Sequence, residues 1–120
     1  MSYELSSTKT KAVKKQILAI DLDGVIHDVN NPVENRRMGA PFDDAQAAMK
    51  RLSHHFVLII YSVKATTPEG AQVVEDWCKY YHIPYDGITA VKPDAVLFID
   101  DKAYRHTDWT TTLAYIKETL

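Results

Sequence analysis

The stretch that decides the fold is residues 17–25, with the sequence ILAIDLDGV. Four apolar residues lead into two carboxylates, Asp21 and Asp23, and Gly24 follows at once. A short apolar run that ends at a chain breaker indicates a buried strand. Two unit charges about 4 Å apart repel by roughly 4 kcal/mol at an effective dielectric constant near 20. A cation or a proton must offset that repulsion, so the strand end is predicted to be a metal site, a catalytic carboxylate pair, or both.

Strands and helices are predicted to alternate along the rest of the chain. Apolar runs predict strands at 17–21, 56–61 and 95–99, with a weak short strand at 88–91. Helical spacing and caps predict three helices: from Asp43 or Asp44 to about Ser53, from a Thr67 cap to about Tyr81, and after a cap at Asp108. This order predicts an α/β fold, a three-layer α/β/α sandwich with a mostly parallel, Rossmann-like sheet.

Composition narrows the class of protein. The 120 residues fit one domain, predicted at 16–120 after a flexible, lysine-rich tail at 1–15. A net charge of -2 gives no global attraction to nucleic acid or to anionic membranes. No stretch approaches the roughly 18 apolar residues of a membrane span, and no signal peptide is visible. Cys78 is the single cysteine, which excludes an internal disulfide, and a reducing, cytoplasmic compartment is expected.

Polar side chains lie next to the strands that the long apolar runs predict. Ser62 follows the second strand, Asp100 and Asp101 follow the last one, and Lys92 precedes it. In open α/β sheets, ligands bind beyond the carboxyl ends of the strands, so these residues are expected to meet the first acidic pair there. Several carboxylates around one crevice need compensation. Mg²⁺ typically uses one or two carboxylates together with waters and a substrate phosphate.

Four motifs in this order resemble the haloacid dehalogenase superfamily of phosphatases and phosphotransferases. An apolar strand ends in Asp21-Leu22-Asp23-Gly24, a second ends in Ser62, Lys92 precedes a third, and that strand ends in Asp100-Asp101. The motifs span residues 17–101, most of the chain. The resemblance implies the core fold of that superfamily, without a cap domain because the chain has no room for one. It also implies a Mg²⁺-dependent phosphatase that hydrolyses a phosphomonoester.

The resemblance assigns a role to each motif residue. Asp21 would be the nucleophile that becomes an aspartyl-phosphate, and Asp23 the general acid and then the base. Ser62 and Lys92 would bind phosphoryl oxygens. Mg²⁺ would be held by Asp21, the backbone carbonyl of Asp23, Asp100 and Asp101.

The loop 25–41 is the one candidate lid, because caps usually select the substrate in this superfamily. His27, Arg36 and Arg37 are its candidate anion contacts, and Lys64 is a further candidate contact without an assigned role. The partner is expected to be a small phosphorylated substrate. A nucleic-acid end is conceivable because the site looks open, although the charge does not support it. The sequence does not indicate the oligomeric state.

Two other classes of function compete with the phosphatase. A non-catalytic phosphate- or nucleic-acid-end-binding protein could keep the same site. A phosphoacceptor signalling domain places its acceptor Asp after a middle strand, where this chain has Ser62, so that order does not fit. The five histidines form no helical i, i+4 pair, which argues against a zinc site.

Overall fold

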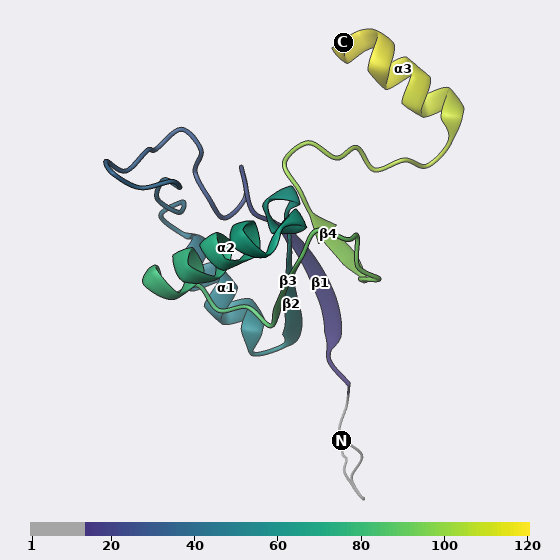
Figure 1. The fold of residues 1–120 in the computed structure, drawn as a ribbon. Coiled ribbons are helices and arrows are strands. Elements are labelled where there is room, and N and C mark those ends of the chain that lie inside the picture. Colours follow the sequence, from purple (N-terminus) through teal and green to yellow (C-terminus); the bar gives the residue numbers. More distant parts are fainter. Residues whose placement is uncertain (1–13) are drawn as a thin grey trace, which may run out of the picture.

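The centre of the protein is a four-stranded, all-parallel sheet with strand order β3-β2-β1-β4 (Figure 1). The structure is a computed structural model that describes residues 14–120, so the predicted tail at 1–15 lies almost wholly outside the described residues. The strands are β1 (Gln16–Asp21), β2 (Phe56–Tyr61), β3 (Gly87–Thr89) and β4 (Leu97–Ile99). The predicted α/β class and parallel sheet are confirmed.

One face of the sheet carries the core. Leu18 pairs with Leu58 and Ile20 with Ile60, and all four are buried. Residues two apart share a face of a strand, so these side chains form one apolar layer. Two helices supply its cover, α1 (Ala45–Ser53) and α2 (Pro68–Tyr80). Both crossovers run in the same direction across the sheet, and right-handed connections therefore place both helices on this face.

Local signals in the sequence set the start of α2. The Thr67 side chain accepts a hydrogen bond from the Gly70 backbone N–H at 3.0 Å, and Pro68 occupies the first helical position. This confirms the predicted cap. The inner face of the helix is apolar, since Val74, Trp77 and Cys78 are buried and Val73 and Tyr81 pack against them. Asp44 lies at the N-cap of α1, but its side chain makes no cap hydrogen bond.

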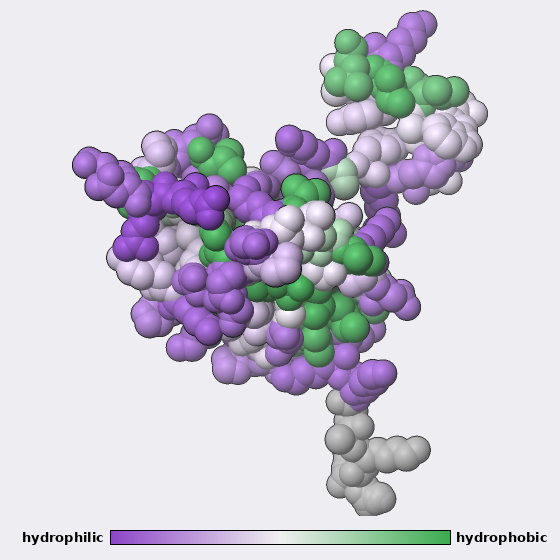
Figure 2. Space-filling view, viewed as in Figure 1, coloured by the Kyte–Doolittle hydropathy of each residue, from purple (hydrophilic) through white to green (hydrophobic). Residues whose placement is uncertain are grey.

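The last helix, α3 (Trp109–Thr119), lies apart from the sheet (Figure 1). The Asp108 side chain accepts from the Thr111 N–H at 2.9 Å, which confirms the predicted cap. The helix packs on the segment that precedes it, where Tyr104 stacks on Tyr115 with centroids 4.6 Å apart. Its apolar side chains are largely exposed (Figure 2). The third layer of the expected sandwich therefore stays a prediction.

The prediction of a buried strand at 95–99 was wrong in extent and in burial. β4 has three residues, of which Leu97 is 48% and Phe98 37% exposed. β4 is an edge strand, and α3 does not cover it. Within residues 14–120, no helix has the length and apolar character needed to cross a membrane.

Candidate metal and phosphate site

Three acidic side chains converge at the carboxyl ends of two neighbouring strands. Asp21 ends β1, and Asp100 and Asp101 directly follow β4. The two strands pair in parallel, with Ile20 opposite Ile99, so their ends meet. One carboxylate oxygen of each acid lies within 4.8 Å of the other two. The topology thus brings together residues that are far apart in the sequence.

The environment of Asp21 disfavours its negative charge. Burial raises the pKa of this carboxyl, and the charges of Asp100, Asp101 and Asp23 raise it further. A hydrogen bond of 2.9 Å from the Leu22 backbone N–H acts in the opposite direction. No cationic side chain among residues 14–120 pairs with this acidic cluster. Carboxylate oxygens that repel one another and lack a cation fit a hard dication such as Mg²⁺.

Backbone features hold the other two acids in place. The Asp100 Oδ1 atom accepts hydrogen bonds from the backbone N–H groups of Lys102 and Ala103, which leaves its second oxygen for a ligand. Gly24 has φ +84°, a conformation that residues with a Cβ rarely adopt. A Cβ at this position would also collide with the Asp101 carboxylate. The glycine therefore permits both the turn and the position of Asp101.

Asp23 is bound to a different set of partners. Its Oδ2 atom accepts a hydrogen bond from Lys64 Nζ at 2.6 Å, and its Oδ1 atom lies 2.7 Å from His27 Nδ1. Burial raises the pKa of Asp23, but the hydrogen bonds from His27 and Lys64 outweigh it, and the pKa is lowered. In this conformation, the side chain expected to carry a proton is stabilised in its ionised form.

His27 positions Asp23 and has no ring nitrogen left for a substrate. Its Nε2 atom accepts a hydrogen bond from the Gly39 backbone N–H at 2.9 Å, so Nδ1 must carry the hydrogen and donate to Asp23. The Gly39 carbonyl in turn accepts from Trp77 Nε1 at 2.8 Å. The bond to Trp77 attaches loop 25–41 to α2, and the bond between Gly39 and His27 lies within the loop. The candidate lid is thus anchored over the helix, and no local pattern in the sequence predicts this contact.

Ser62 and Lys64 belong to one short turn after β2. Tyr61 lies opposite Asp21, which places the following Ser62 beside the acidic cluster. Ser62 is buried, and its hydroxyl oxygen accepts from the Lys64 backbone N–H at 3.2 Å at the start of a 3₁₀ helix, η1 (Val63–Thr66). That turn directs the Lys64 side chain back to Asp23. A lysine two residues after Ser62 was the signal in the sequence for this contact.

Lys92 has a different environment from Lys64. It lies on the connection between β3 and β4, and its Nζ atom is 5.0 Å from the centroid of the Phe98 ring. Among residues 14–120, no hydrogen bond or ion pair joins it to the acidic cluster. Its phosphate-binding role stays a prediction.

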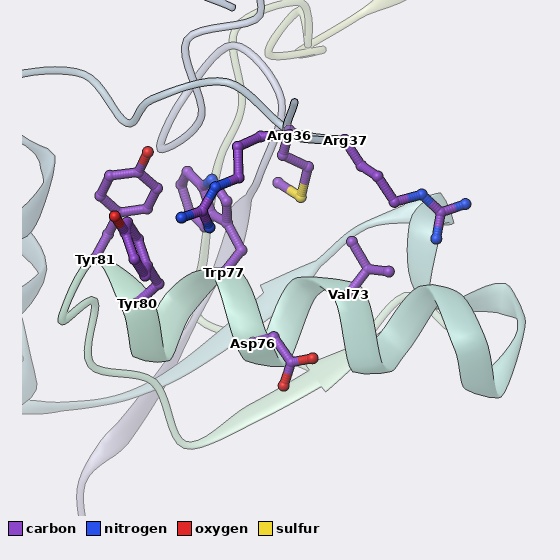
Figure 3. A pocket seen from close by; sticks show the side chains of 8 residues that line it. Arg36, Arg37, Val73, Asp76, Trp77, Tyr80 and Tyr81 are labelled. Carbon is purple, nitrogen blue, oxygen red and sulfur yellow. The ribbon is translucent and has the colours of Figure 1, made fainter. Parts of the chain in front are cut away.

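Arg36 and Arg37 also lie away from the acids. They border a cavity against α2, where the Arg36 guanidinium carbon is 4.2 Å from the centroid of the Tyr80 ring (Figure 3).

Comparison of the chain with family models, with curated proteins and with solved structures gives no match.

Proposed function

We propose that the chain is a Mg²⁺-dependent phosphatase of the haloacid dehalogenase type, which hydrolyses a phosphomonoester through an aspartyl-phosphate. The observation that carries this proposal is the convergence of Asp21, Asp100 and Asp101 within 4.8 Å at the ends of two parallel strands. A buried hydroxyl, Ser62, and a lysine, Lys64, lie at the neighbouring strand end. Carboxylates of this kind would bind the dication, and the hydroxyl and ammonium groups would contact the phosphoryl oxygens.

The metal site of the proposed enzyme would use side chains of Asp21, Asp100 and Asp101 and the backbone carbonyl of Asp23. When bound, Mg²⁺ would offset the repulsion between the carboxylates and the phosphoryl group and polarise that group for attack. A small, oxygen-only donor set of this kind is typical of magnesium sites that also hold a substrate phosphate.

The chain's own residues would carry out two displacements at phosphorus. An Asp21 oxygen attacks the phosphorus, the bond to the leaving oxygen breaks, and Asp23 gives that oxygen a proton. Asp23 then takes a proton from a water molecule, whose oxygen attacks the phosphorus and breaks its bond to Asp21. Inorganic phosphate leaves, and both aspartates return to their starting states.

Lys64 would control the protonation of Asp23. In the structure, its ammonium group pairs with Asp23 and lowers the pKa of that carboxyl. A phosphoryl group bound beside Ser62 would compete for the same ammonium group. Loss of the ion pair would raise the pKa of Asp23 and let it act as an acid. In this scheme Lys64 binds the phosphoryl group together with Ser62. The family resemblance instead assigns this phosphate-binding role to Lys92.

Phosphate release from p-nitrophenyl phosphate with Mg²⁺ tests the proposal. Asp21→Asn should lower the rate by about a thousandfold or more, because it removes the nucleophile. The matched control is Asp94→Asn, an exposed acid that precedes β4 at the opposite end of the strand. Absence of hydrolysis by the wild-type protein across a broad panel of phosphomonoesters would contradict the proposal.

A second candidate is a non-catalytic protein that binds Mg²⁺ and a phosphate group. The Asp23–Lys64 ion pair favours it, because an ionised, paired carboxylate is a poor general acid. Calorimetric titration with Mg²⁺ and phosphate, combined with the activity assay, separates the two candidates. Binding without turnover would select the non-catalytic protein.

A further inference from the structure

A groove begins at Lys64 and runs along α2 toward Tyr80 and Tyr81. Two adjoining cavities of about 270 Å³ and 190 Å³ form it, and they share Arg37, Met38 and Val73 as lining residues. Lys64 lines the larger cavity. Because the same lysine contacts Asp23, the groove begins at the proposed phosphate site.

Two arginines without an acidic partner in the described part of the chain face this groove. Arg36 and Arg37 extend over it from loop 25–41, and neither has an acidic partner at salt-bridge distance within residues 14–120. Asp76 also borders it, but its carboxylate points away from both arginines (Figure 3) and accepts a hydrogen bond from Gln72 at 2.8 Å. Glu69, exposed at the edge of the larger cavity, is the other acid that lines it. The arginine side of the groove can therefore contact an anionic ligand.

The far end of the groove offers a flat surface. The Arg36 guanidinium covers the Tyr80 ring, and Tyr81 packs edge-on against Tyr80 with centroids 4.9 Å apart. All three side chains gather at this end (Figure 3). Aromatic rings and guanidinium planes are the surfaces on which unpaired nucleobases stack. A stacked guanidinium also keeps N–H donors at its edges for phosphate oxygens.

The length of the groove indicates the size of a ligand that would contact both of its ends. From Gly70 to Tyr80 the helix advances by about 15 Å, at about 1.5 Å per residue. A sugar phosphate held at Lys64 is too short to reach Tyr80, whereas linked nucleotides are long enough. The wall formed by loop 25–41 is already in place because Gly39 is bonded to His27 and Trp77.

We infer that the substrate is a short single-stranded oligonucleotide with a terminal phosphate. The terminal phosphate lies at the acidic site, the next phosphate lies beside Arg37, and a base stacks on the Arg36–Tyr80 pair. This inference rests on the proposed phosphatase for the position of the terminal phosphate. It does not need an overall positive charge, because the two arginines concentrate charge along the groove.

A kinetic comparison tests the inference. With Mg²⁺, kcat/KM is measured for p-nitrophenyl phosphate and for tetranucleotides that carry the phosphate at the 3′ or the 5′ end. The better tetranucleotide should exceed p-nitrophenyl phosphate by at least tenfold, and Arg36→Gln should reduce that ratio at least tenfold. Arg51→Gln, an exposed arginine on α1, is the matched control and should keep the ratio. Equal kcat/KM values, or a ratio unchanged in Arg36→Gln, would overturn the inference and leave the phosphatase standing.

A binding measurement tests the oligonucleotide inference even if the protein hydrolyses none of these substrates. Fluorescence anisotropy follows a labelled, terminally phosphorylated tetranucleotide, and the Kd should rise at least tenfold when Arg36→Gln and Arg37→Gln are combined. Because Arg37 makes the one phosphate contact that this double variant removes, the slope of log affinity against log salt concentration should decrease by about 0.7. Equal affinity of the wild type and the double variant would overturn the inference. Tighter binding of a phosphotyrosine peptide than of the oligonucleotide would also overturn it.

Discussion

Neutralising Asp21 should stabilise the metal-free protein while it abolishes the proposed activity. At 4.8 Å, the upper limit of the separations within the acidic cluster, two carboxylates repel by about 0.9 kcal/mol at the dielectric constant of water and about 3.5 kcal/mol at an effective value of 20. Asp100 and Asp101 are exposed, so the lower figure applies to both pairs, and Asp21→Asn should gain about 2 kcal/mol. Asparagine keeps the oxygen that accepts from the Leu22 N–H, so no hydrogen bond is lost.

Urea unfolding with and without Mg²⁺ measures the effect. In EDTA, Asp21→Asn should be more stable than the wild type. At a Mg²⁺ concentration of about 100 times Kd, the wild type should gain about 2.7 kcal/mol, whereas the variant lacks one ligand and should gain less. Mg²⁺ should therefore remove or reverse the difference between the two proteins. Asp94→Asn, outside the cluster, should follow the wild type in both conditions.

Two results would refute the reasoning. If Asp21→Asn is less stable than the wild type in EDTA, the three carboxylates do not repel one another as their separation implies. If Mg²⁺ stabilises both proteins equally, the cluster around Asp21 is not where the ion binds.

Three further tests use one labelling reaction and two substitutions. Burial raises the pKa of the Cys78 thiol to about 12, so a thiol reagent at pH 8 should label it only after unfolding. Lys64→Met should lower the free energy of unfolding by about 0.5–1 kcal/mol at pH 7, because it removes a half-exposed ion pair. Since folding lowers the pKa of Asp23, that difference should persist above about pH 4 and vanish as the pH falls through the folded-state pKa, as followed by urea titrations. Trp77→Phe removes the donor to the Gly39 carbonyl and should cost about 1–3 kcal/mol in the same assay.

The tests on Cys78 and Lys64 each have a contradicting outcome, and the test on Trp77 has a matched control. Rapid labelling of Cys78 in the native protein would show that its surroundings open readily. An effect of Lys64→Met that stays constant down to the lowest pH at which the protein remains folded would show that the lysine acts through packing and not through charge. Trp109→Phe, an exposed tryptophan on α3, is the control for Trp77→Phe and should change stability by less than about 0.5 kcal/mol.

The sequence predicted those elements whose signals are local. The apolar run at 56–61 has the bounds of β2, and Thr67 followed by Pro68 marks the start of α2. The meeting of Asp21 with Asp100 also followed from the sequence, because parallel strands place their carboxyl ends at one edge of the sheet.

Features that depend on the path of a loop or on distant packing could not be predicted. The role of Lys64 depends on the 3₁₀ turn after Ser62, and the role of His27 depends on where loop 25–41 meets α2. The exposure of Phe98 depends on whether α3 covers β4, and neither segment's own sequence specifies that.

The anchoring of loop 25–41 has a consequence for turnover. In enzymes with a closing lid, opening of the lid on a microsecond-to-millisecond scale often limits the rate. Here the loop is held at Gly39 by hydrogen bonds to His27 and Trp77. The proposed phosphatase would cycle without such a gate, and products would leave along the groove beside the anchored loop. Its rate should then depend on bond breaking at Asp21 and be insensitive to solvent viscosity.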